Sequence, residues 1–326
     1  MISGTSVFPA ERIDLDDETY LIGGKGDLRP LLESIREWGL INPILLQERK
    51  DQRYRIISGR RRLLCCIQLG WSGISARVAT DALSDLDCLK IAVSDNRSHR
   101  SFNLIEQSDG IHKLEPHFSE KEGFTAISLL LDIPLNLKVF QKIRGLARLD
   151  TRIQEEIVRG GLSLEGAVAL FPFEPSEQMG LFELMKELNL SQNKECELIE
   201  LVDEIARRET VSPLQVIRSN PIRKIMENRD QNRPEKTRKV RSYLKQRRFP
   251  SITEAEDRFC ANLGTLKLGN SIRLSPPPSF EGSTYNVRFS FKTAEEFRQR
   301  METLQEASKK PAFNKIMQKN EGLGTK

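Results

Sequence analysis

The sequence of 326 residues predicts a multidomain α+β protein, on three observations. Short apolar runs between turn signals indicate a mixed α/β region near the start. Helical segments with almost no β pattern fill the middle, and an α-β-β-α pattern stands near the end. The low apolar share, 38%, with 30% charged residues, suits several small modules joined by polar helices rather than one compact enzyme.

These patterns divide the chain into four regions and a tail. The first is the mixed α/β region, the second is all-helical with a helix-turn-helix, the third is a helical and basic linker, and the fourth is a small dimerisation module. Their boundaries are predicted at residues 1–95, 96–175, 176–248 and 249–310, with a tail over 311–326.

In the first region, two strands lead into a helix. Pro43–Leu46 and Tyr54–Ile57 are predicted to form a hairpin across a polar turn. Ser58 and Gly59 end the second strand, and a helix follows from Arg60 to Leu69. Further elements expected here are a strand at Arg12–Leu15 and helices over residues 27–37 and 82–94.

The helix-turn-helix is predicted from two short helices and the break between them. Ser119 and Glu122 have the spacing of a capping box, and the helix they open is interrupted at Asp132-Ile133-Pro134. A second helix covers about 136–147, with Val139, Ile143 and Leu146 on its apolar face. Short helices split by a tight turn are typical of a helix-turn-helix, although an ordinary helical bundle would show the same pattern.

The fourth region is predicted to dimerise because its core is small. Helices at Thr253–Leu266 and Thr293–Ala307 enclose strands at Ser271–Leu274 and Tyr285–Phe291. The second strand alternates apolar and polar residues, which indicates a half-buried strand. A unit of about 60 residues covers such a face poorly by itself, so a two-fold dimer is expected. The last residues, 314–326, are expected to be frayed.

Charge is concentrated in one segment. The whole chain carries +5, whereas Arg218–Arg248 holds 12 basic and three acidic residues, a net charge of +9. A concentrated basic block on an otherwise near-neutral chain is typical of proteins that bind polyanions such as nucleic acid. The alternative is a solvated, flexible linker.

Several function classes lack their motifs in this sequence. The five cysteines form no C-x-x-C pair, and the three histidines form no metal-binding helix face. No P-loop and no G-x-S-x-G motif is present, which counts against P-loop ATPases and serine hydrolases. Apolar runs are far shorter than the ~20 residues of a membrane span, and the start lacks signal-peptide features, so a cytoplasmic protein with no membrane association is expected.

The junction Ser58-Gly59-Arg60-Arg61-Arg62 is the sharpest local feature. Free N–H groups at the helix start, together with three guanidinium groups, make a natural phosphate site. Basic residues in a first turn are unfavourable for the helix dipole, which suggests that an anion compensates them. The alternative is a surface helix with a basic first turn.

Two boxes carry a resemblance to a known family. The runs Leu31–Ile44 and Tyr54–Arg62 closely resemble the N-terminal domain of the ParB family of chromosome and plasmid partition proteins, a fold shared with the sulfiredoxin enzymes. Gly59, Arg61 and Arg62 fit the family's G-E-R-R box, with Arg60 in place of glutamate. The next family box, E-N-x-x-R followed by N-P-I-E, is similar to Asp95–His99 and Asn103–Glu106.

The resemblance implies that the N-terminal domain binds CTP with Mg²⁺ and is at most a weak CTP hydrolase. Arginine forks match phosphate oxygens, and amide or carboxylate oxygens suit a hard cation. Arg60 either tightens triphosphate binding or blocks a contact with the base or ribose. The residues assigned to the nucleotide are Gly59, Arg60, Arg61, Arg62, Asn96 and Glu106, and those assigned to the metal are Asn96 and Asp95.

The middle region is similar to the family's parS-binding domain. The second helix of the helix-turn-helix is then expected in the major groove, with its polar residues reaching base edges or phosphates. The candidates for DNA contact are Asn136, Lys138, Gln141, Lys142 and Arg144.

The resemblance implies a sequence-specific DNA-binding partition protein. Such a protein binds a parS-like site on double-stranded DNA as a homodimer with a CTP-dependent clamp. It acts on the nucleoid with a ParA-type Walker ATPase. The alternatives are a transcriptional regulator or nucleoid-associated protein of a mobile element, or a ParB-like nuclease. A sulfiredoxin-like enzyme is disfavoured because Gly59 is followed by Arg60 rather than by Cys-His.

Overall fold

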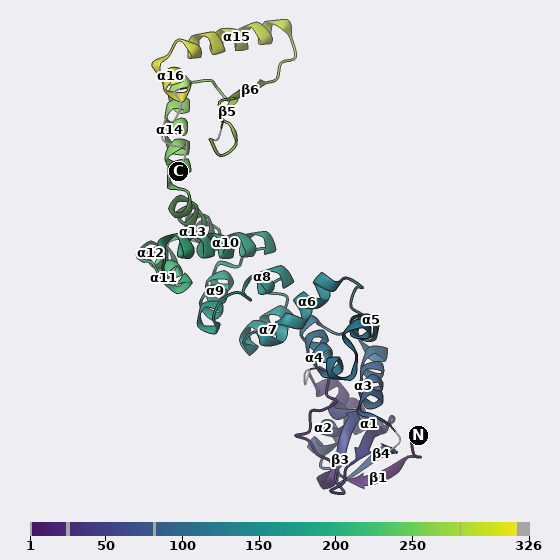
Figure 1. Cartoon of the computed structure of the whole chain (residues 1–326). Helices are drawn as coiled ribbons and strands as arrows, with labels where there is room; N and C mark the ends of the chain where they lie inside the picture. The colour runs from purple at the N-terminus through teal and green to yellow at the C-terminus, as the bar shows by residue number, and fades with distance from the viewer. Residues whose placement is uncertain (1, 24–26, 81–82, 281, 318–326) are drawn as a thin grey trace. The chain divides into compact units, whose positions relative to one another are not determined.

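A computed structural model describes residues 2–23, 27–80, 83–280 and 282–317 (Figure 1). The chain divides into two compact units, residues 1–196 and 197–326, and each is described by itself. The first begins with a mixed α/β part, and most of the remaining chain is helical. Among the described residues, no helix has both the length and the apolar character needed to cross a membrane.

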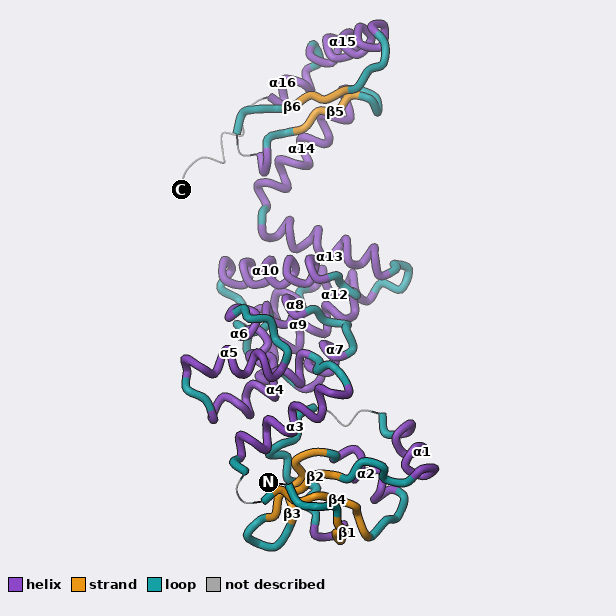
Figure 2. The backbone as a smooth tube through the Cα atoms, turned by 90° about the vertical axis from the view of Figure 1, so that its right-hand side faces the viewer, coloured by secondary structure: helices purple, strands orange, loops and turns teal. Residues whose placement is uncertain are grey.

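The N-terminal sheet has four strands in the order β1-β4-β2-β3. These are β1 (Ser6–Pro9), β2 (Ile44–Glu48), β3 (Tyr54–Ser58) and β4 (Gly73–Ala79). The predicted hairpin is confirmed, since β2 and β3 pair antiparallel. Strand β4 was not predicted, and it pairs parallel with β2 and antiparallel with β1 (Figure 2).

The strand expected at Arg12–Leu15 was wrong. A 3₁₀ helix covers Ala10–Arg12, and Ile13 makes only an isolated bridge to Tyr54. Ile13 is nevertheless buried in the core under the sheet. The apolar signal at this position therefore reflects packing rather than strand pairing.

Helices α1 (Arg29–Trp38) and α2 (Arg60–Gln68) pack with the sheet around one hydrophobic core. Ile35 of α1 and Leu63 of α2 are buried in this core together with Ile44 and Ile74 of the strands. Helix α1 begins one residue later than the predicted cap at Asp27 implies, and the Asp27 carboxylate accepts a hydrogen bond from the N–H of its first residue, Arg29.

A second core joins helix α3 (Asp85–His99) to the helices that follow it. Cys88 and Leu89 of α3 belong to the same buried cluster as Ile111 and Ile127. The boundary predicted at residue 95 falls inside α3. The other helices of this unit are α4 (Leu104–Leu114), α5 (Glu120–Leu131), α6 (Leu137–Gly145), α7 (Thr151–Val158), α8 (Leu164–Ala169) and α9 (Pro175–Leu188).

Helices α5 and α6 stand where the helix-turn-helix is predicted. Helix α5 ends at Leu131, and the φ of +58° at its C-cap, Asp132, turns the chain. The buried side of α6 is Phe140 and Ile143, whereas Val139 is only half-buried. The buried side of α6 therefore starts at Phe140 rather than at the predicted Val139, because the Phe140 ring packs edge to face against Phe124, with ring centroids 5.4 Å apart.

The region predicted as a linker is folded. It contains α10 (Gln192–Glu209), which spans the division between the two units, and then α11 (Pro213–Ile217), α12 (Asn220–Glu227) and α13 (Arg233–Arg248). Within the second unit, Val202 and Ile205 of α10 and Val240 and Leu244 of α13 are buried. A flexible chain would leave these side chains exposed, so the basic block belongs to a packed structure.

The C-terminal region has the predicted α-β-β-α order. It consists of α14 (Pro250–Leu266), the antiparallel pair β5 (Ile272–Ser275) and β6 (Asn286–Phe289), and α15 (Ala294–Ser308). Thr293 caps α15 as its position suggested.

Two expectations for this region were wrong. A further helix, α16 (Pro311–Met317), covers residues 314–317 of the segment expected to be frayed, and residues 318–326 of that segment lie outside the described residues. Ile316 is buried, and its carbonyl accepts a hydrogen bond from the Tyr285 hydroxyl at 2.8 Å. The second strand is shorter than predicted, and only part of its apolar face meets the core: Tyr285 and Phe289 pack against it, whereas Val287 and Phe291 are 47% and 52% exposed. A single copy of the chain therefore does not cover this face.

Candidate nucleotide and DNA sites

A cavity of about 320 Å³ lies in the N-terminal unit, where the end of β3 meets the start of α2. Helix α3 and the segment before α1 complete its walls. Four arginines and two aspartates line it, so its formal charge is positive. The polar side chains of the lining are Asp17, Tyr20, Asn42, Ser58, Arg60, Arg61, Arg62, Asp95, Asn96 and Arg100.

Gly59 makes the turn that opens this cavity. It precedes α2 with φ of +95°, a region that favours glycine. A Cβ atom there would lie 2.8 Å from Cγ2 of Ile44, so a side chain would also clash with β2. The turn directs the N-terminus of α2, with its free N–H groups, at the cavity.

Arg62 is already paired inside the protein. Its Nη2 lies 3.1 Å from Oδ2 of Asp95, and its Nη1 donates to the carbonyl of Asn42 at 3.0 Å. The Ser58 hydroxyl donates to the same Asp95 oxygen. The predicted phosphate ligand Arg62 and the predicted metal ligand Asp95 thus hold each other.

Arg60 is the lining arginine whose buried donors lack a partner in the described part of the chain. Its side chain is 14% exposed, and its Nε and Nη1 are buried without a hydrogen-bond partner in the described part of the chain. Its Nη2 lies 3.9 Å from a carboxylate oxygen of Glu18, a distant ion pair. By contrast, the neighbouring Arg61 donates to the Asp27 carbonyl at 2.6 Å.

Asn96 and Glu106 have different surroundings. Asn96 lines the cavity, and its amide N–H donates to the Ala92 carbonyl at 2.8 Å. Glu106 is buried behind the lining, where Arg100 donates to its two oxygens at 2.5 and 2.7 Å. Glu106 also caps α4 through the Asn103 N–H, so it positions Arg100 rather than facing the cavity.

The donor set fits Mg²⁺ poorly. Mg²⁺ needs near-octahedral oxygen ligands, usually including one or two carboxylates. Each carboxylate of the lining, Asp17 and Asp95, already carries an arginine. Among the described residues, no group of three or more histidines, cysteines, aspartates or glutamates could hold a metal ion.

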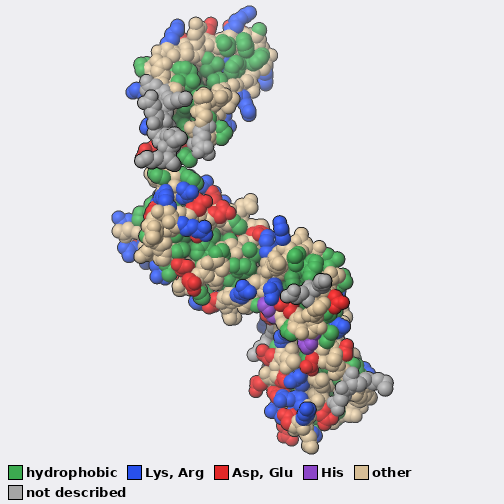
Figure 3. Space-filling view, viewed as in Figure 1, with side chains coloured by type: hydrophobic (Ala, Val, Ile, Leu, Met, Phe, Trp, Pro, Cys, Tyr) green, Lys and Arg blue, Asp and Glu red, His purple; other side chains and the backbone are tan. Residues whose placement is uncertain are grey.

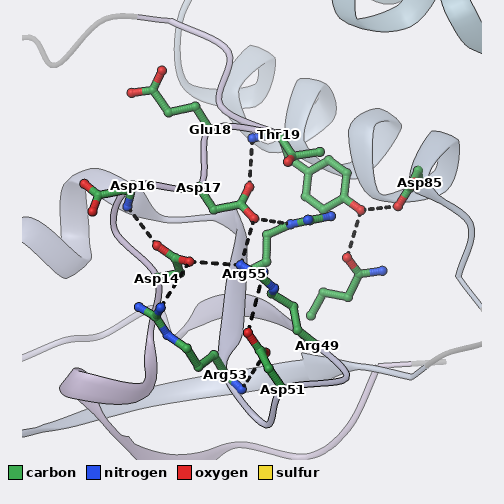
Figure 4. A network of polar contacts seen from close by, with 12 residues as sticks. Asp14, Asp16, Asp17, Glu18, Thr19, Arg49, Asp51, Arg53, Arg55 and Asp85 are labelled. Carbon is green, nitrogen blue, oxygen red and sulfur yellow. Dashed lines mark hydrogen bonds and ion pairs between the residues drawn. The ribbon is translucent and has the colours of Figure 1, made fainter.

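A polar network around Asp17 supports one wall of the cavity (Figure 4). Burial by itself would raise the pKa of Asp17, but hydrogen bonds from Thr19 and Arg55 outweigh it and hold that pKa below its usual value. The Tyr20 hydroxyl donates to Asp85 at 2.5 Å, and burial together with this bond raises its pKa. Asp17 is therefore ionised and Tyr20 neutral near pH 7.

Sequence reasoning missed Asp17, Tyr20 and Arg100 as lining residues. None of them stands in a recognisable motif. Asp17 and Tyr20 precede α1 by about ten residues, and only the fold brings them to the end of β3. The one available signal was Arg100, which follows the box at Asp95–His99 directly.

On α6, three of the predicted DNA contacts have partners within the chain. Asn136 caps the helix, its Oδ1 accepting from the Lys138 and Val139 N–H groups. Lys142 donates to both oxygens of Glu165 at 2.7 Å. Arg144 pairs with Glu115 at 2.8 Å.

The other two predicted DNA contacts on α6 are not engaged by other side chains. Lys138 and Gln141 are exposed, and neither side chain has a hydrogen-bond or ion-pair partner among the residues that the structure describes. They lie three positions apart, so they share one face of the helix. This face, which we call the α6 polar face, is free to meet a ligand.

On α13 the basic residues fall into two groups. Within the second unit, four of them pair with carboxylates of α10: Arg241 and Lys245 with Glu197, Arg247 with Glu209, and Arg248 with Glu204. Arg238 and Lys239 are exposed, with no side-chain partner in the described ranges. Much of the block's formal charge is therefore neutralised internally.

Comparison with known proteins identifies the N-terminal part. Residues 24–97 match the family model described as ParB N-terminal domain, the segment that supplies Gly59, the three arginines and Asn96. A curated relative, the nucleoid occlusion protein of Bacillus mycoides (strain KBAB4), is 26% identical over 208 residues, which are 61% of this chain and 69% of the relative. Residues 24–97 are therefore a ParB N-terminal domain.

Other ParB-related proteins match over comparable lengths. The nucleoid occlusion protein of Bacillus cereus (strain AH187) has the same identity and coverage as the first relative. The truncated ParB of Caulobacter crescentus complexed to parS is 22% identical, with a TM-score of 0.37, covering 60% of this chain and 98% of that one. Its complex with CTP-γ-S is 24% identical, with a TM-score of 0.26, covering 53% and 94%.

Proposed function

We propose that this protein is a DNA-binding member of the ParB family that acts in DNA segregation or nucleoid occlusion. One observation carries the proposal: the segment that matches the ParB N-terminal domain is the segment that forms the arginine-lined cavity. The relatives' names, nucleoid occlusion protein and chromosome-partitioning protein, supply the two roles.

The cavity is proposed to bind CTP. The Gly59 turn, the α2 N-terminus and the arginines suit phosphate oxygens, because guanidinium forks and backbone N–H groups are the usual phosphate donors. The Caulobacter relative has been crystallised with CTP-γ-S, which supports the choice of nucleotide. For Mg²⁺, which the resemblance also implies, both carboxylates of the lining, Asp17 and Asp95, are already paired with arginines.

The DNA site is proposed to be a parS-like duplex bound by α5 and α6. The α6 polar face, Lys138 and Gln141, would read bases, since Gln recognises adenine and Lys recognises guanine or phosphate. The exposed residues Arg238 and Lys239 would add affinity that is independent of sequence. The parS complex of the Caulobacter relative supports this assignment.

The C-terminal region is proposed to form the homodimer. Val287 and Phe291 near β6, with Phe297 and Met301 of α15, are exposed apolar side chains. Phe291 and Phe297 stack edge to face at 4.9 Å, and hydrophobic side chains gather over α15 in Figure 3. Truncation after Arg248 should leave a monomer without nucleotide, and light scattering that reports a dimer for this truncation would contradict the assignment.

A ParA-type ATPase is the proposed partner on the nucleoid, and two other functions compete. A transcriptional regulator would share the α6 polar face. A nuclease would need a carboxylate cluster for its metal, and the described residues supply none. Partition or nucleoid occlusion therefore has the stronger support.

Genome-wide immunoprecipitation tests this proposal. A ParB-type protein that binds and spreads gives sharp peaks with broad flanks around a few related sequences. Separate narrow peaks at promoters would instead indicate a transcriptional regulator. Calorimetry with CTP, ATP, GTP and UTP tests the nucleotide, and equal affinity for all four would reject a CTP site.

A further inference from the structure

Within the proposed nucleotide site, the Arg60 guanidinium is a largely buried positive charge whose Nε and Nη1 have no partner among the described residues. We propose that the cavity holds the free triphosphate of a nucleotide without Mg²⁺, with the Arg60 guanidinium supplying the positive charge that a metal ion would otherwise bring. The inference rests on the proposed CTP site and states how that site neutralises the phosphates.

The first support is the state of the Arg60 side chain. Its Nε and Nη1 are buried and have no hydrogen-bond partner among the described residues, although buried polar atoms are nearly always bonded. Its closest carboxylate, Glu18, is 3.9 Å away and exposed to solvent. A desolvated guanidinium needs an anion, and an anion entering the cavity would supply the missing acceptors.

The second support is the state of the cavity's carboxylates. Asp95 is held by Arg62 and Ser58, and Asp17 by Arg55 and Thr19. To bind Mg²⁺, either aspartate would have to give up an arginine. Breaking such a half-buried pair leaves the arginine without its partner, which is costly.

The third support is the balance of charge. Four arginines and two aspartates line the cavity, so its formal charge is +2. A free nucleoside triphosphate is more negative than its magnesium complex by the two charges of the ion. The lining therefore complements the free triphosphate better, and a cation beside Arg60 would meet a like charge at short range.

The test compares CTP binding by the full-length protein in excess Mg²⁺ and in EDTA, by calorimetry. We expect the dissociation constant in EDTA to be equal to or lower than that in Mg²⁺. A dissociation constant about tenfold or more higher in EDTA overturns the inference and leaves the CTP site standing. Absence of CTP binding under both conditions would instead reject the proposed nucleotide site.

Variants at position 60 localise the effect. Arg60→Glu should weaken CTP binding in EDTA by about tenfold or more, and Mg²⁺ should restore part of the affinity, because the new carboxylate can hold the ion. Arg36→Glu is the matched control, since Arg36 is exposed on α1 outside the cavity, and it should bind like the wild type.

Arg60→Gln keeps much of the side chain's size without charge and serves where the glutamate variant does not fold. It too should bind more weakly in EDTA than the wild type. Wild-type affinity in EDTA for a folded Arg60 variant contradicts the role of this guanidinium. Inorganic tripolyphosphate should compete with CTP in EDTA, and failure to compete would show that the phosphates are not what the cavity recognises.

Discussion

Two arginine-rich segments of this protein hold their charges in different ways. At the start of α2, Arg60 to Arg62 surround a cavity, and Arg60 keeps two buried nitrogens without a partner. On α13, four basic residues form ion pairs with glutamates of α10. Others, such as Arg238 and Lys239, are exposed and have no partner in the described chain.

The difference shows that formal charge does not measure available charge. The segment Arg218–Arg248 has a net charge of +9, yet the carboxylates that neutralise part of it lie outside the segment. The three arginines of α2 carry less formal charge but line a cavity, in which the Arg60 side chain is only 14% exposed. Low dielectric makes an unmatched charge matter more there than on an open helix.

The largest effect is expected at the cavity. Arg61→Ala should weaken CTP binding by about 1.5–3 kcal/mol, the scale of a lost hydrogen bond to a charged group, or roughly tenfold to a hundredfold. Calorimetry measures this change, and Arg36→Ala is the control on α1. An unchanged dissociation constant for the Arg61 variant would contradict the proposal that Arg61 binds the phosphates.

The second prediction separates base reading from general attraction. Replacing Lys138 and Gln141 with alanine should reduce the preference for the cognate DNA site by about 1–3 kcal/mol per lost base contact. The salt dependence should stay nearly as steep, because the phosphate contacts elsewhere persist. Fluorescence anisotropy with cognate and scrambled duplexes measures both. If the double variant still prefers the cognate duplex, residues outside the α6 polar face read the DNA sequence.

The third prediction sharpens the contrast within α13. Replacing Arg238 and Lys239 with alanine should lower affinity for all duplexes alike, and should flatten the slope of log K against log salt by up to about 0.9 per lost phosphate contact. Arg241→Ala is the matched control, since its side chain is already paired with Glu197. If the double variant keeps the wild-type slope, the exposed charges of α13 only solvate the helix.

The fourth prediction concerns stability, for which the paired Arg241 should matter more than the exposed Arg238. Arg241→Ala should lower the free energy of unfolding by about 0.5–1 kcal/mol, because the pair with Glu197 is partly exposed and screened. Arg238→Ala should leave it nearly unchanged. Urea unfolding followed by circular dichroism compares the two, and equal effects would mean that the ion pair contributes nothing measurable.

The smallest effect is expected on acidification. Burial by itself would raise the pKa of Glu197, but hydrogen bonds from Lys245 and Arg241 outweigh it and lower that pKa. The hydrogen bond from Arg247 lowers the pKa of Glu209. Because both pKa values lie below the unfolded value of about 4.3, their stabilisation is complete above that pH and is lost as pH falls through the folded values.

Unfolding free energies measured at stepped pH test this. The wild type should lose more stability than Arg241→Ala as the pH drops below about 4. Parallel curves for the two proteins would show that the Glu197 pair does not take part.

Local signals in the sequence were sufficient for several features. The hairpin of β2 and β3, the glycine turn at Gly59 and the cap at Thr293 depend on residues close to one another in the chain. The phosphate-site hypothesis at Arg60–Arg62 also came from neighbours, since the end of a strand, a glycine and a helix start lie within a few positions.

Only the tertiary structure decided which of these groups are engaged. Strand β4 pairs with β1 and β2 across tens of residues, and its short alternating run did not reveal those partners. The pairs Arg62–Asp95 and Arg241–Glu197 likewise join residues 33 and 44 positions apart. A residue's type states what it can bind, whereas the fold sets which partners come within a few ångströms, and electrostatic and hydrogen-bond energies fall steeply beyond that range.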